Sequence, residues 1–397
     1  MLNIVRPHLL QPFWLIIVIF TLLGCSDRDV INEGDCRVIE VDLSSKMGKY
    51  EDYFQYRSFI ALETTEESLV QWVDKIEFYN DTIFILDSRQ AIVLVFDGTG
   101  KYISKIDRKG RSGEEYLSLS DFFIDGSNRI YVYDGTQGVV ILYDFQGLFI
   151  NRIEIEKGYS FTKLPDNNWL LYLGNGFAID GEDTFYNTLV YDENFTLIDR
   201  ALPFNQHMQG LKHTSGSVKS VISNYDSTTY ILPLLSNYIY SYSPVNSRVE
   251  CSYKVVFKNK QNEIVNAKMK PKEIEDNLRK MGEGLIPSRI NNFYKIGNSI
   301  FFRFSYSRQG WFCFYEESNQ LAILCNFTFD ENGLLFNPVN YFSNKKGKEI
   351  VSIVDGDTFT TCKKLDKNSN PIIHSINESI NGIDDPNPIL VFYTLKP

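Results

Sequence analysis

Short apolar runs bounded by turn residues recur along this chain, and one such unit occurs twice in succession. In the first copy Ile83–Asp87 is followed by Phe96–Gly100, and in the second Ile130–Asp134 is followed by Tyr143–Gly147. The two copies align without a gap at an offset of 47 residues. A repeat of this length, made of short strands and tight turns, indicates a radial or stacked array of similar units.

The first copy predicts four strands, at Val73–Tyr79, Thr82–Leu86, Ile92–Asp97 and Tyr102–Asp107. The Asp and Gly residues between them suit tight turns, because they tolerate left-handed backbone or bond to it locally. The second copy runs from about 119 to 155. A four-stranded up-and-down sheet that recurs every 40–50 residues or so is typical of a β-propeller blade.

Looser copies of this strand rhythm follow, at about Phe161–Arg200, Val218–Phe257 and Phe293–Phe329. The C-terminal part then offers three strands, so an N-terminal strand is expected to supply the fourth and to close the ring. The three are Glu349–Val354, Thr358–Lys364 and Ile389–Leu395, and the fourth is Val38–Val41 or Phe59–Leu62.

The predicted fold is therefore all-β, a six-bladed β-propeller of four-stranded antiparallel blades with one short inserted helix. The helix is expected at Ala267–Gly282, between blades four and five, where Ile274, Leu278 and Met281 recur at helical spacing. The last blade is shared by N- and C-terminal strands.

The first 24 residues read as a targeting segment that takes no part in the fold. A basic start precedes an apolar run from Phe13 to Gly24, which is too short to span a bilayer, since that needs about 20 helical residues. The run ends in Leu22-Leu23-Gly24-Cys25, which looks like a bacterial lipobox, so Cys25 is expected to carry lipid. An ordinary secretory signal that ends in cysteine is the alternative.

These observations divide the chain into a signal peptide at 1–24, a lipidated tether at 25–35 and a propeller at 36–397. The expected location is the outer membrane of the cell envelope, either on its periplasmic or on its surface-exposed side. The sequence does not predict an oligomeric state.

The net charge of −10 argues against a nucleic-acid partner, which selects basic faces. The cysteines lack the paired spacing of zinc sites. Apart from Cys25, they are expected to be buried free thiols, and a disulfide between Cys313 and Cys325 is the alternative. The other three are Cys36, Cys251 and Cys362.

Two segments, Asp87–Ile103 and Asp134–Ile150, resemble the NHL-type repeat of six-bladed propellers. Leu62–Leu69, Lys109–Asp121 and the terminal Asn387–Lys396 resemble the six-bladed β-propeller lipoproteins of Gram-negative gut anaerobes. The resemblance implies a propeller fold and an envelope location. It implies no mechanism, because that family mostly has no assigned activity.

Propeller geometry places the long and charged connections on one face of the ring, which is therefore the candidate binding face. Arginine there could recognise an anionic or hydroxyl-rich ligand, because it offers planar pairs of donors. A solvated loop with salt bridges between blades is the alternative. The candidate residues are Arg89, Arg108, Lys109, Arg111, Glu114 and Glu115.

No catalytic residue, metal or cofactor is predicted. Asp87 and Asp134 could be metal ligands, but their recurrence at one spacing favours turn capping. His207 and His213 lie in one connection and make a weak ligand pair, and His374 lies far from both. The chain lacks a nucleophile elbow, a zinc-protease helix motif and a helix-opening phosphate loop.

The sequence thus favours a lipid-anchored envelope propeller that binds a glycan, a peptide or a partner protein. Its contact with the membrane would be made through the lipid. The alternative function is that of a metal-dependent hydrolase or lyase that acts at the central channel.

Overall fold

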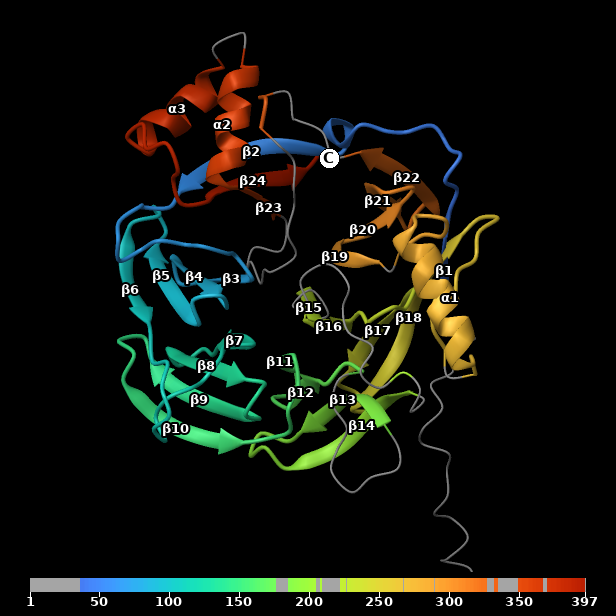
Figure 1. Ribbon diagram of the computed structural model, residues 1–397, viewed down its shortest axis with the longest axis horizontal. Coiled ribbons are helices and arrows are strands. Elements are labelled where there is room, and N and C mark those ends of the chain that lie inside the picture. The colour runs from blue at the N-terminus through green and yellow to red at the C-terminus, as the bar shows by residue number, and fades with distance from the viewer. Residues whose placement is uncertain are drawn as a thin grey trace, which may run out of the picture.

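Six small β-sheets stand around a central axis and form a ring (Figure 1). The computed structural model describes residues 36–396 apart from 176–184, 205–207, 209–221, 226, 267, 289, 327–331, 335–348 and 367–369. Among the described strands all pairings are antiparallel except that of β1 with β18. The predicted six-bladed β-propeller is confirmed.

The first two blades are the two copies of the repeat. Blade one contains β3 (Lys75–Tyr79), β4 (Thr82–Asp87), β5 (Ile92–Asp97) and β6 (Tyr102–Ile106). Blade two contains β7 (Asp121–Ile124), β8 (Arg129–Asp134), β9 (Val139–Asp144) and β10 (Phe149–Glu154). The two middle strands of each blade are almost wholly buried, which explains why they read as unbroken apolar runs.

Two buried aspartates explain why the repeat recurs. At the end of β4, Asp87 accepts hydrogen bonds from two amides of the loop that enters the blade, at 2.8 and 2.9 Å, and from Gln90. At the end of β8, Asp134 accepts bonds from two amides of the next such loop, at 2.8 and 3.1 Å, and from Gln137. Each carboxylate ties a turn to the incoming loop, so the turn-capping interpretation is confirmed.

Blades three to five follow with four consecutive strands each. Blade three contains β11 (Ser160–Lys163), β12 (Trp169–Tyr172), β13 (Phe185–Tyr191) and β14 (Leu197–Phe204). Blade four contains β15 (Ile222–Tyr225), β16 (Thr228–Ile231), β17 (Tyr238–Ser243) and β18 (Arg248–Phe257). Blade five contains β19 (Asn291–Ile296), β20 (Ser299–Tyr306), β21 (Gln309–Glu316) and β22 (Leu321–Asn326).

Blade six joins the two ends of the chain. Its sheet has the order β2 (Phe54–Ala61), β24 (Ile389–Leu395) and β23 (Glu349–Val354). The N-terminal β2 pairs antiparallel with the C-terminal β24, with Phe59 opposite Val391. In the part of the chain that the structure describes, this blade has three strands rather than the expected four.

The prediction of a strand at Thr358–Lys364 was wrong. This segment is helix α2 (Gly356–Leu365), and α3 (Pro371–Ser379), which was not predicted, follows it. The Asp355 carboxylate caps the amide of Thr358 at 2.8 Å. The buried Phe359 and Cys362 are three residues apart, a helical rather than an alternating spacing. Both helices lie outside blade six (Figure 1).

The first described residues, from Cys36 to the start of β2 at Phe54, cross the rim of the ring, and we call this segment the strap. Strand β1 (Arg37–Val41) adds a fifth, parallel strand to β18 of blade four, and Cys36 forms a disulfide with Cys251 of that strand. The chain then passes blade five, where the Gly48 amide donates to the Leu324 carbonyl at 2.9 Å. After the short helix η2 (Tyr50–Asp52) it enters blade six as β2.

The cysteine prediction was partly wrong, because the Cys36–Cys251 disulfide was not foreseen. Cys313, Cys325 and Cys362 are free and buried, as expected. Cys313 and Cys325 lie on paired strands but are one step out of register, since Phe312 is opposite Cys325. Their side chains therefore point to opposite faces of blade five and cannot form the alternative disulfide.

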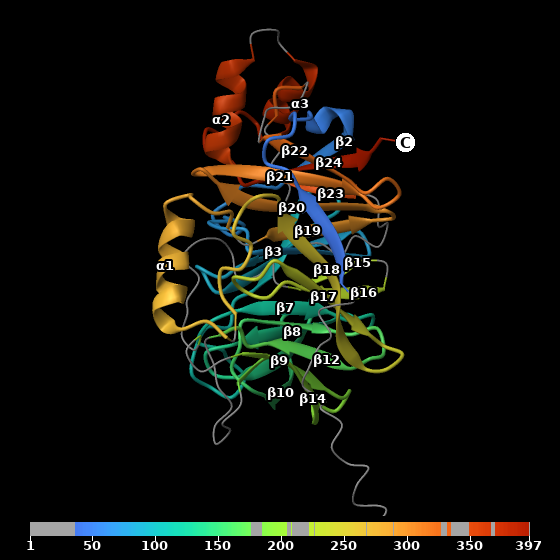
Figure 2. The ribbon, with the colours of Figure 1, turned by 90° about the vertical axis from the view of Figure 1, so that its right-hand side faces the viewer.

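The inserted helix α1 (Pro271–Gly282) confirms the prediction, although it begins at Pro271 rather than Ala267. It follows blade four in the chain, and Figure 2 shows it beyond the strands on one face of the ring. Ile274 and Leu278 face Phe204 and Met208 in a small apolar cluster. Over the described residues, no helix is long and apolar enough to cross a membrane.

Candidate functional site

The predicted charged loop, residues 108–115, folds back against blade two. The Arg108 guanidinium donates to the Gly147 carbonyl at 3.1 Å, and its amide donates to the Tyr116 hydroxyl at 3.0 Å. The Glu115 carboxylate accepts the Ser112 amide at 2.8 Å, and this bond lowers the pKa of Glu115. Two of the six charged residues proposed from the sequence, Arg108 and Glu115, thus have side-chain partners in their own loop or on a turn of blade two.

The remaining predicted residues are exposed at the surface. Lys109, Arg111 and Glu114 extend from the charged loop, and Arg89 lies on the β4–β5 turn. The Arg89 guanidinium stacks over the ring of Trp72, 4.1 Å from its centroid. None of the six predicted residues lines the cavity at the centre of the ring.

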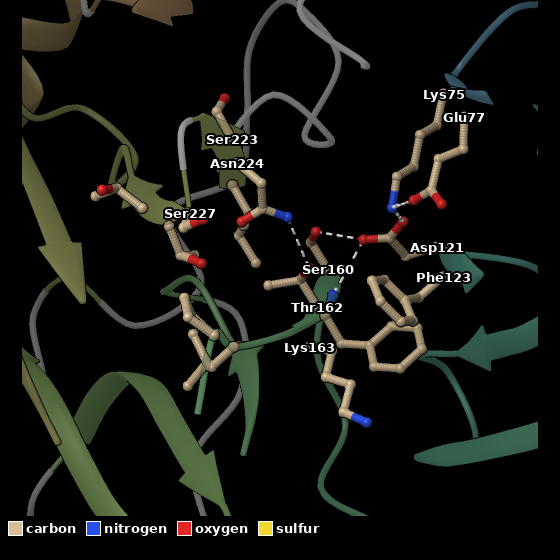
Figure 3. A pocket seen from close by; sticks show the side chains of 16 residues that line it. Lys75, Glu77, Asp121, Phe123, Ser160, Thr162, Lys163, Ser223, Asn224 and Ser227 are labelled. Carbon is tan, nitrogen blue, oxygen red and sulfur yellow. Dashed lines mark hydrogen bonds and ion pairs between the residues drawn. The ribbon is translucent and has the colours of Figure 1, made fainter. Parts of the chain in front are cut away.

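This cavity, which we call the channel pocket, lies among the inner strands of blades one to four (Figure 3). Its volume is about 380 Å³. Small-molecule sites typically have volumes of about 300–1,000 Å³, so the pocket has a suitable size. Figure 3 shows Lys75, Glu77 and Asp121 on one side and Ser223, Asn224 and Ser227 on the other, with Ser160 and Thr162 between them.

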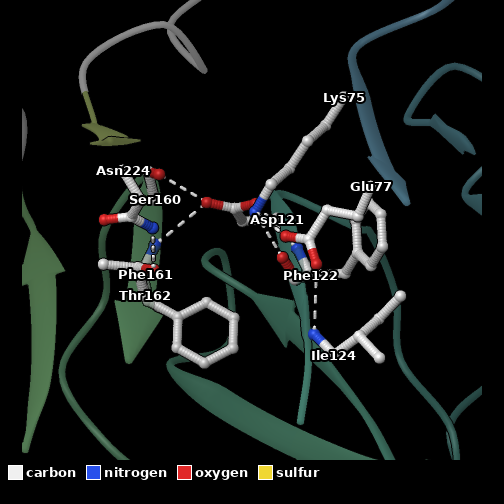
Figure 4. A network of polar contacts seen from close by, with 9 residues as sticks. All are labelled: Lys75, Glu77, Asp121, Phe122, Ile124, Ser160, Phe161, Thr162 and Asn224. Carbon is white, nitrogen blue, oxygen red and sulfur yellow. Dashed lines mark hydrogen bonds and ion pairs between the residues drawn. The ribbon is translucent and has the colours of Figure 1, made fainter. Parts of the chain in front are cut away.

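Lys75 on β3 joins blades one and two. Its Nζ lies 2.8 Å from Asp121 Oδ1 and 2.9 Å from Glu77 Oε1, and it also donates to the Phe122 carbonyl (Figure 4). These three acceptors match the three N–H bonds of the ammonium group. The side chains of Lys75, Glu77 and Asp121 are 16%, 9% and 2% exposed, so the cluster is shielded from water.

Asp121 extends this network to blade three. Its second oxygen accepts the hydroxyl of Ser160 and, at 3.0 Å, the amide of Phe161. Further along β11, Thr162 accepts the side-chain amide of Asn224 on β15 at 3.0 Å. Polar contacts therefore link four successive inner strands, and they hold blades one to four together at the channel.

Burial and ion pairing act in opposite directions on the cluster. Burial raises the pKa of Glu77, because it disfavours the carboxylate, and the Lys75 ammonium offsets only part of this effect. Burial alone would lower the pKa of Lys75, but Asp121 and Glu77 outweigh it and raise that pKa above its ordinary value. Lys75 therefore stays charged, while Glu77 takes up a proton more readily than a free glutamate.

Across the pocket, Asn224 has one polar atom without a partner. Its Nδ2 donates to Thr162, whereas its Oδ1 is buried and has no hydrogen-bond partner among the described residues. Turning the amide over would exchange the two ends and still leave one unpaired. Such a buried group without a hydrogen-bond partner costs about 1–3 kcal/mol.

Two further predictions concern metal ligands. Within the described ranges, no group of three or more His, Cys, Asp or Glu side chains is placed to hold a metal ion. His207 and His213 lie outside the described residues. His374 lies on α3, with its Nε2 3.3 Å from Glu378, and its side chain is 72% exposed.

Sequence reasoning missed the channel pocket, although one signal was present. Lys75 and Glu77 occupy alternate positions in the strand predicted at Val73–Tyr79, which opens a blade and is therefore an inner strand. An inner strand is covered on both faces by neighbouring blades, so charged side chains there must find partners. The partners themselves come from other blades and carry no local signal.

Comparisons with known proteins agree with the fold. The family model described as a domain of unknown function (DUF4934) matches residues 37–394. The crystal structure of an exported protein from Bacteroides fragilis NCTC 9343 covers 91% of this chain and 100% of its own, with 18% identity and a TM-score of 0.71. A DUF4221 family member from Bacteroides vulgatus ATCC 8482 covers 87% and 99%, with 12% identity and a TM-score of 0.50. No curated protein matches the chain.

Proposed function

The chain belongs to the DUF4934 family, whose function is unknown, and we propose that it is a binding module of the cell envelope that takes a small ligand into its channel pocket. The sequence suggested a glycan, a peptide or a partner protein, and of these we keep the glycan and the peptide, which can be small enough for a pocket. The place of binding moves from the charged loop to the centre of the ring.

One observation carries this proposal: the pocket is an open cavity of about 380 Å³ into which polar groups from four blades converge. Ligand sites in proteins are concave, largely preformed and equipped with a few polar groups that orient the ligand. The charged loop offers exposed charges instead, which are screened by salt and contribute little affinity.

An envelope location fits the sequence and one neighbour. The B. fragilis protein of similar fold is described as exported. We propose that Cys25 carries a lipid anchor and that residues 26–35 form the tether. Fully extended, ten residues reach about 35 Å, so the ring would stay near the membrane surface. Replacing Cys25 with Ala should release the protein from the membrane fraction; unchanged membrane association would contradict the anchor.

The binding proposal can be tested with full-length protein in a detergent without a sugar head group. A panel of small glycans and short peptides is screened by thermal shift and ligand-observed NMR. Thr228 lines the pocket and is partly exposed, so Thr228→Trp should fill the cavity and abolish binding. Thr361→Trp, at an exposed position of α2, is the matched control and should bind normally.

The charged loop is tested in the same screen. Replacing Arg89, Arg108 and Arg111 with Ala should leave small-ligand binding unchanged. Binding that survives in Thr228→Trp but disappears in the triple Ala variant would return the site to the charged loop. Melting temperatures measured for all variants separate loss of binding from loss of folding.

A further inference from the structure

We propose that the ring rests against the membrane on one particular face, with the β17–β18 turn of blade four in contact with lipid. This face, which we call the turn face, carries the short turns that join the first to the second and the third to the fourth strand of blades one to five. The opposite side, with the charged loop and helix α1, is the loop face. The inference rests on the lipid anchor of the proposed function and adds the orientation of the molecule on the bilayer.

Strand β1 fixes the side from which the tether reaches the ring. It runs parallel to β18, with Arg37 opposite Tyr253. The Cys36–Cys251 disulfide holds the beginning of β1 against that strand. Because β18 begins at Arg248, directly after the β17–β18 turn, its parallel neighbour also begins on the turn-face side. The chain therefore enters β1 from the turn face.

The tether is long enough to bring this side to the bilayer. Tyr253 lies five residues after Arg248, the first residue of β18, which corresponds to about 17 Å at the rise of a strand. The ten tether residues, 26–35, reach about 35 Å when fully extended. A tether that ends beside Tyr253 can thus leave the β17–β18 turn in contact with the surface in which the lipid is embedded.

The tip of this turn is apolar and exposed. It contains Pro244 and Val245, and Val245 is 95% exposed, the highest value among the described large apolar side chains. Each of the other four-stranded blades also exposes a large apolar side chain at the turn-face end of its outer strand: Ile103, Leu148, Ile198 and Leu321. Apolar side chains that enter the boundary between head groups and acyl chains stabilise surface binding. Because these residues are spaced one to a blade, they suit an extended lipid surface better than a compact protein partner, whose interface has a contiguous apolar centre.

The loop face is less suited to this contact. After blade four it carries α1, and Figure 2 shows this helix beyond the strands of the ring. The helix exposes charged side chains, and Arg279 pairs there with Asp276 and Glu283. A bilayer on this side would meet the charged helix before the strands of the ring, and burying these charges is costly.

The charges of the turn face indicate the kind of lipid contact. Asp97, Asp144 and Asp192 each cap a turn before an outer strand by accepting a backbone amide at 2.9 Å. These carboxylates are repelled by anionic head groups, so anionic lipid should not strengthen the contact. The basic residues of the charged loop would be attracted by anionic lipid instead, which makes the lipid charge a second way to tell the two faces apart.

The test uses the full-length protein in phosphatidylcholine vesicles whose acyl chains carry a quencher. A fluorophore is attached to one introduced cysteine, Val245→Cys on the turn face or Arg111→Cys on the loop face, both at exposed positions, while the free thiols at 313, 325 and 362 are buried. The label at 245 should be quenched several-fold more than the label at 111. Adding phosphatidylglycerol should not increase the quenching at 245.

Variants connect the contact to the apolar tip. With the label at the exposed position 318, introduced as Ser318→Cys on the corresponding turn of blade five, Val245→Asp should reduce the quenching severalfold, because a carboxylate at the tip has to stay hydrated. Leu285→Asp is the matched control, since Leu285 is an exposed apolar residue after α1 on the loop face, and it should leave the quenching unchanged. Equal quenching in the Val245→Asp and Leu285→Asp proteins would overturn the role of the tip.

Flotation with the vesicles separates the orientation from the anchor. If the protein floats but the label at 245 is quenched no more than the label at 111, the orientation is wrong and the anchor is right. Stronger quenching at 111, increased by phosphatidylglycerol, would place the loop face on the membrane and overturn the inference. If the protein does not float, the anchor fails and the orientation fails with it. Ligand binding in the channel pocket is measured separately, and none of these outcomes changes it.

Discussion

The charged loop and the channel pocket are both rich in ionisable residues, but most of those in the loop are exposed to solvent, whereas those at the channel are enclosed and paired. In the charged loop, Lys109, Arg111 and Glu114 are exposed and Arg108 donates to a turn carbonyl of blade two. At the channel, Asp121 is buried and Lys75 is largely enclosed, and the two pair across two blades at 2.8 Å. The run of closely spaced charged residues in the sequence thus corresponds to a solvated loop. The enclosed polar pocket was indicated only by a few charged residues inside a predicted strand.

The difference matters because an ionic contact contributes a different free energy at an exposed position than at a buried one. Exposed ion pairs contribute about 0–1 kcal/mol and are weakened by salt. Buried ions interact strongly with their partners and are costly when a partner is lost. Breaking a contact in each region should therefore give effects of very different size.

The largest effect is expected for Lys75→Met, which leaves Glu77 and Asp121 buried without their counter-charge. Removing one partner of a buried pair typically destabilises a protein by about 3–5 kcal/mol. Equilibrium denaturation should show this loss in the free energy of unfolding. Lys109→Met, in the charged loop, is the control and should change that free energy by less than about 0.5 kcal/mol. Equal losses of unfolding free energy in Lys75→Met and Lys109→Met would contradict the difference between the channel pocket and the charged loop.

A pH-dependent effect of intermediate size is expected for Glu77. Burial raises the pKa of Glu77 in the folded protein above its ordinary value of 4.5, so the folded state binds a proton at higher pH than the unfolded state. As the pH falls from 7 toward about 4.5, the unfolding free energy of the wild type should therefore rise relative to that of Glu77→Gln. As the pH rises again through the folded-state pKa, that advantage is lost.

Denaturation at pH 7, 6 and 5 measures this difference. Glu114→Gln, at an exposed position in the charged loop, is the matched control, and it should change the unfolding free energy by less than about 0.5 kcal/mol. A Glu77→Gln difference that does not vary with pH would mean that the channel carboxylate is not shielded from water.

The smallest effect is expected for Arg89→Ala. Its guanidinium stacks on Trp72 at an exposed position, where such a contact contributes about 0.5–1 kcal/mol. Thermal unfolding should show a small decrease in stability, while Arg111→Ala should show none. A decrease of several kcal/mol would mean that the turn that carries Arg89 is a structural element rather than a solvated surface.

The sequence predicted those parts of the fold whose cause is local. Asp87 and Asp134 recur because each closes a turn and holds the next loop, so the repeat and the first two blades could be recognised. Helix α1 was predicted for the same reason, since its apolar residues recur at helical spacing. The segment at 358–364 was wrongly predicted to be a strand, because a ring of four-stranded blades was expected to continue there.

The channel pocket could not be predicted in the same way. Lys75 meets Asp121 at a separation of 46 residues, and Asn224 meets Thr162 at a separation of 62. These separations along the sequence depend on the length of each blade and the curvature of the ring, so no short sequence pattern predicts which residues will be in contact. The disulfide was missed for the same reason, because it joins residues 215 apart.

The strap has a consequence for how the molecule can be made. Cys36 and β1 are completed by residues of blade four, and β2 is completed by β24, so that Arg57 bonds to Thr394 across 337 residues. During synthesis, the N-terminal strand β2 therefore cannot pair until the C-terminal strand β24 has been made. A chain whose first strands cannot pair until its last have emerged remains open while it is being produced. The Cys36–Cys251 disulfide, which ties the strap to blade four, is of the kind that forms and persists in an oxidising compartment.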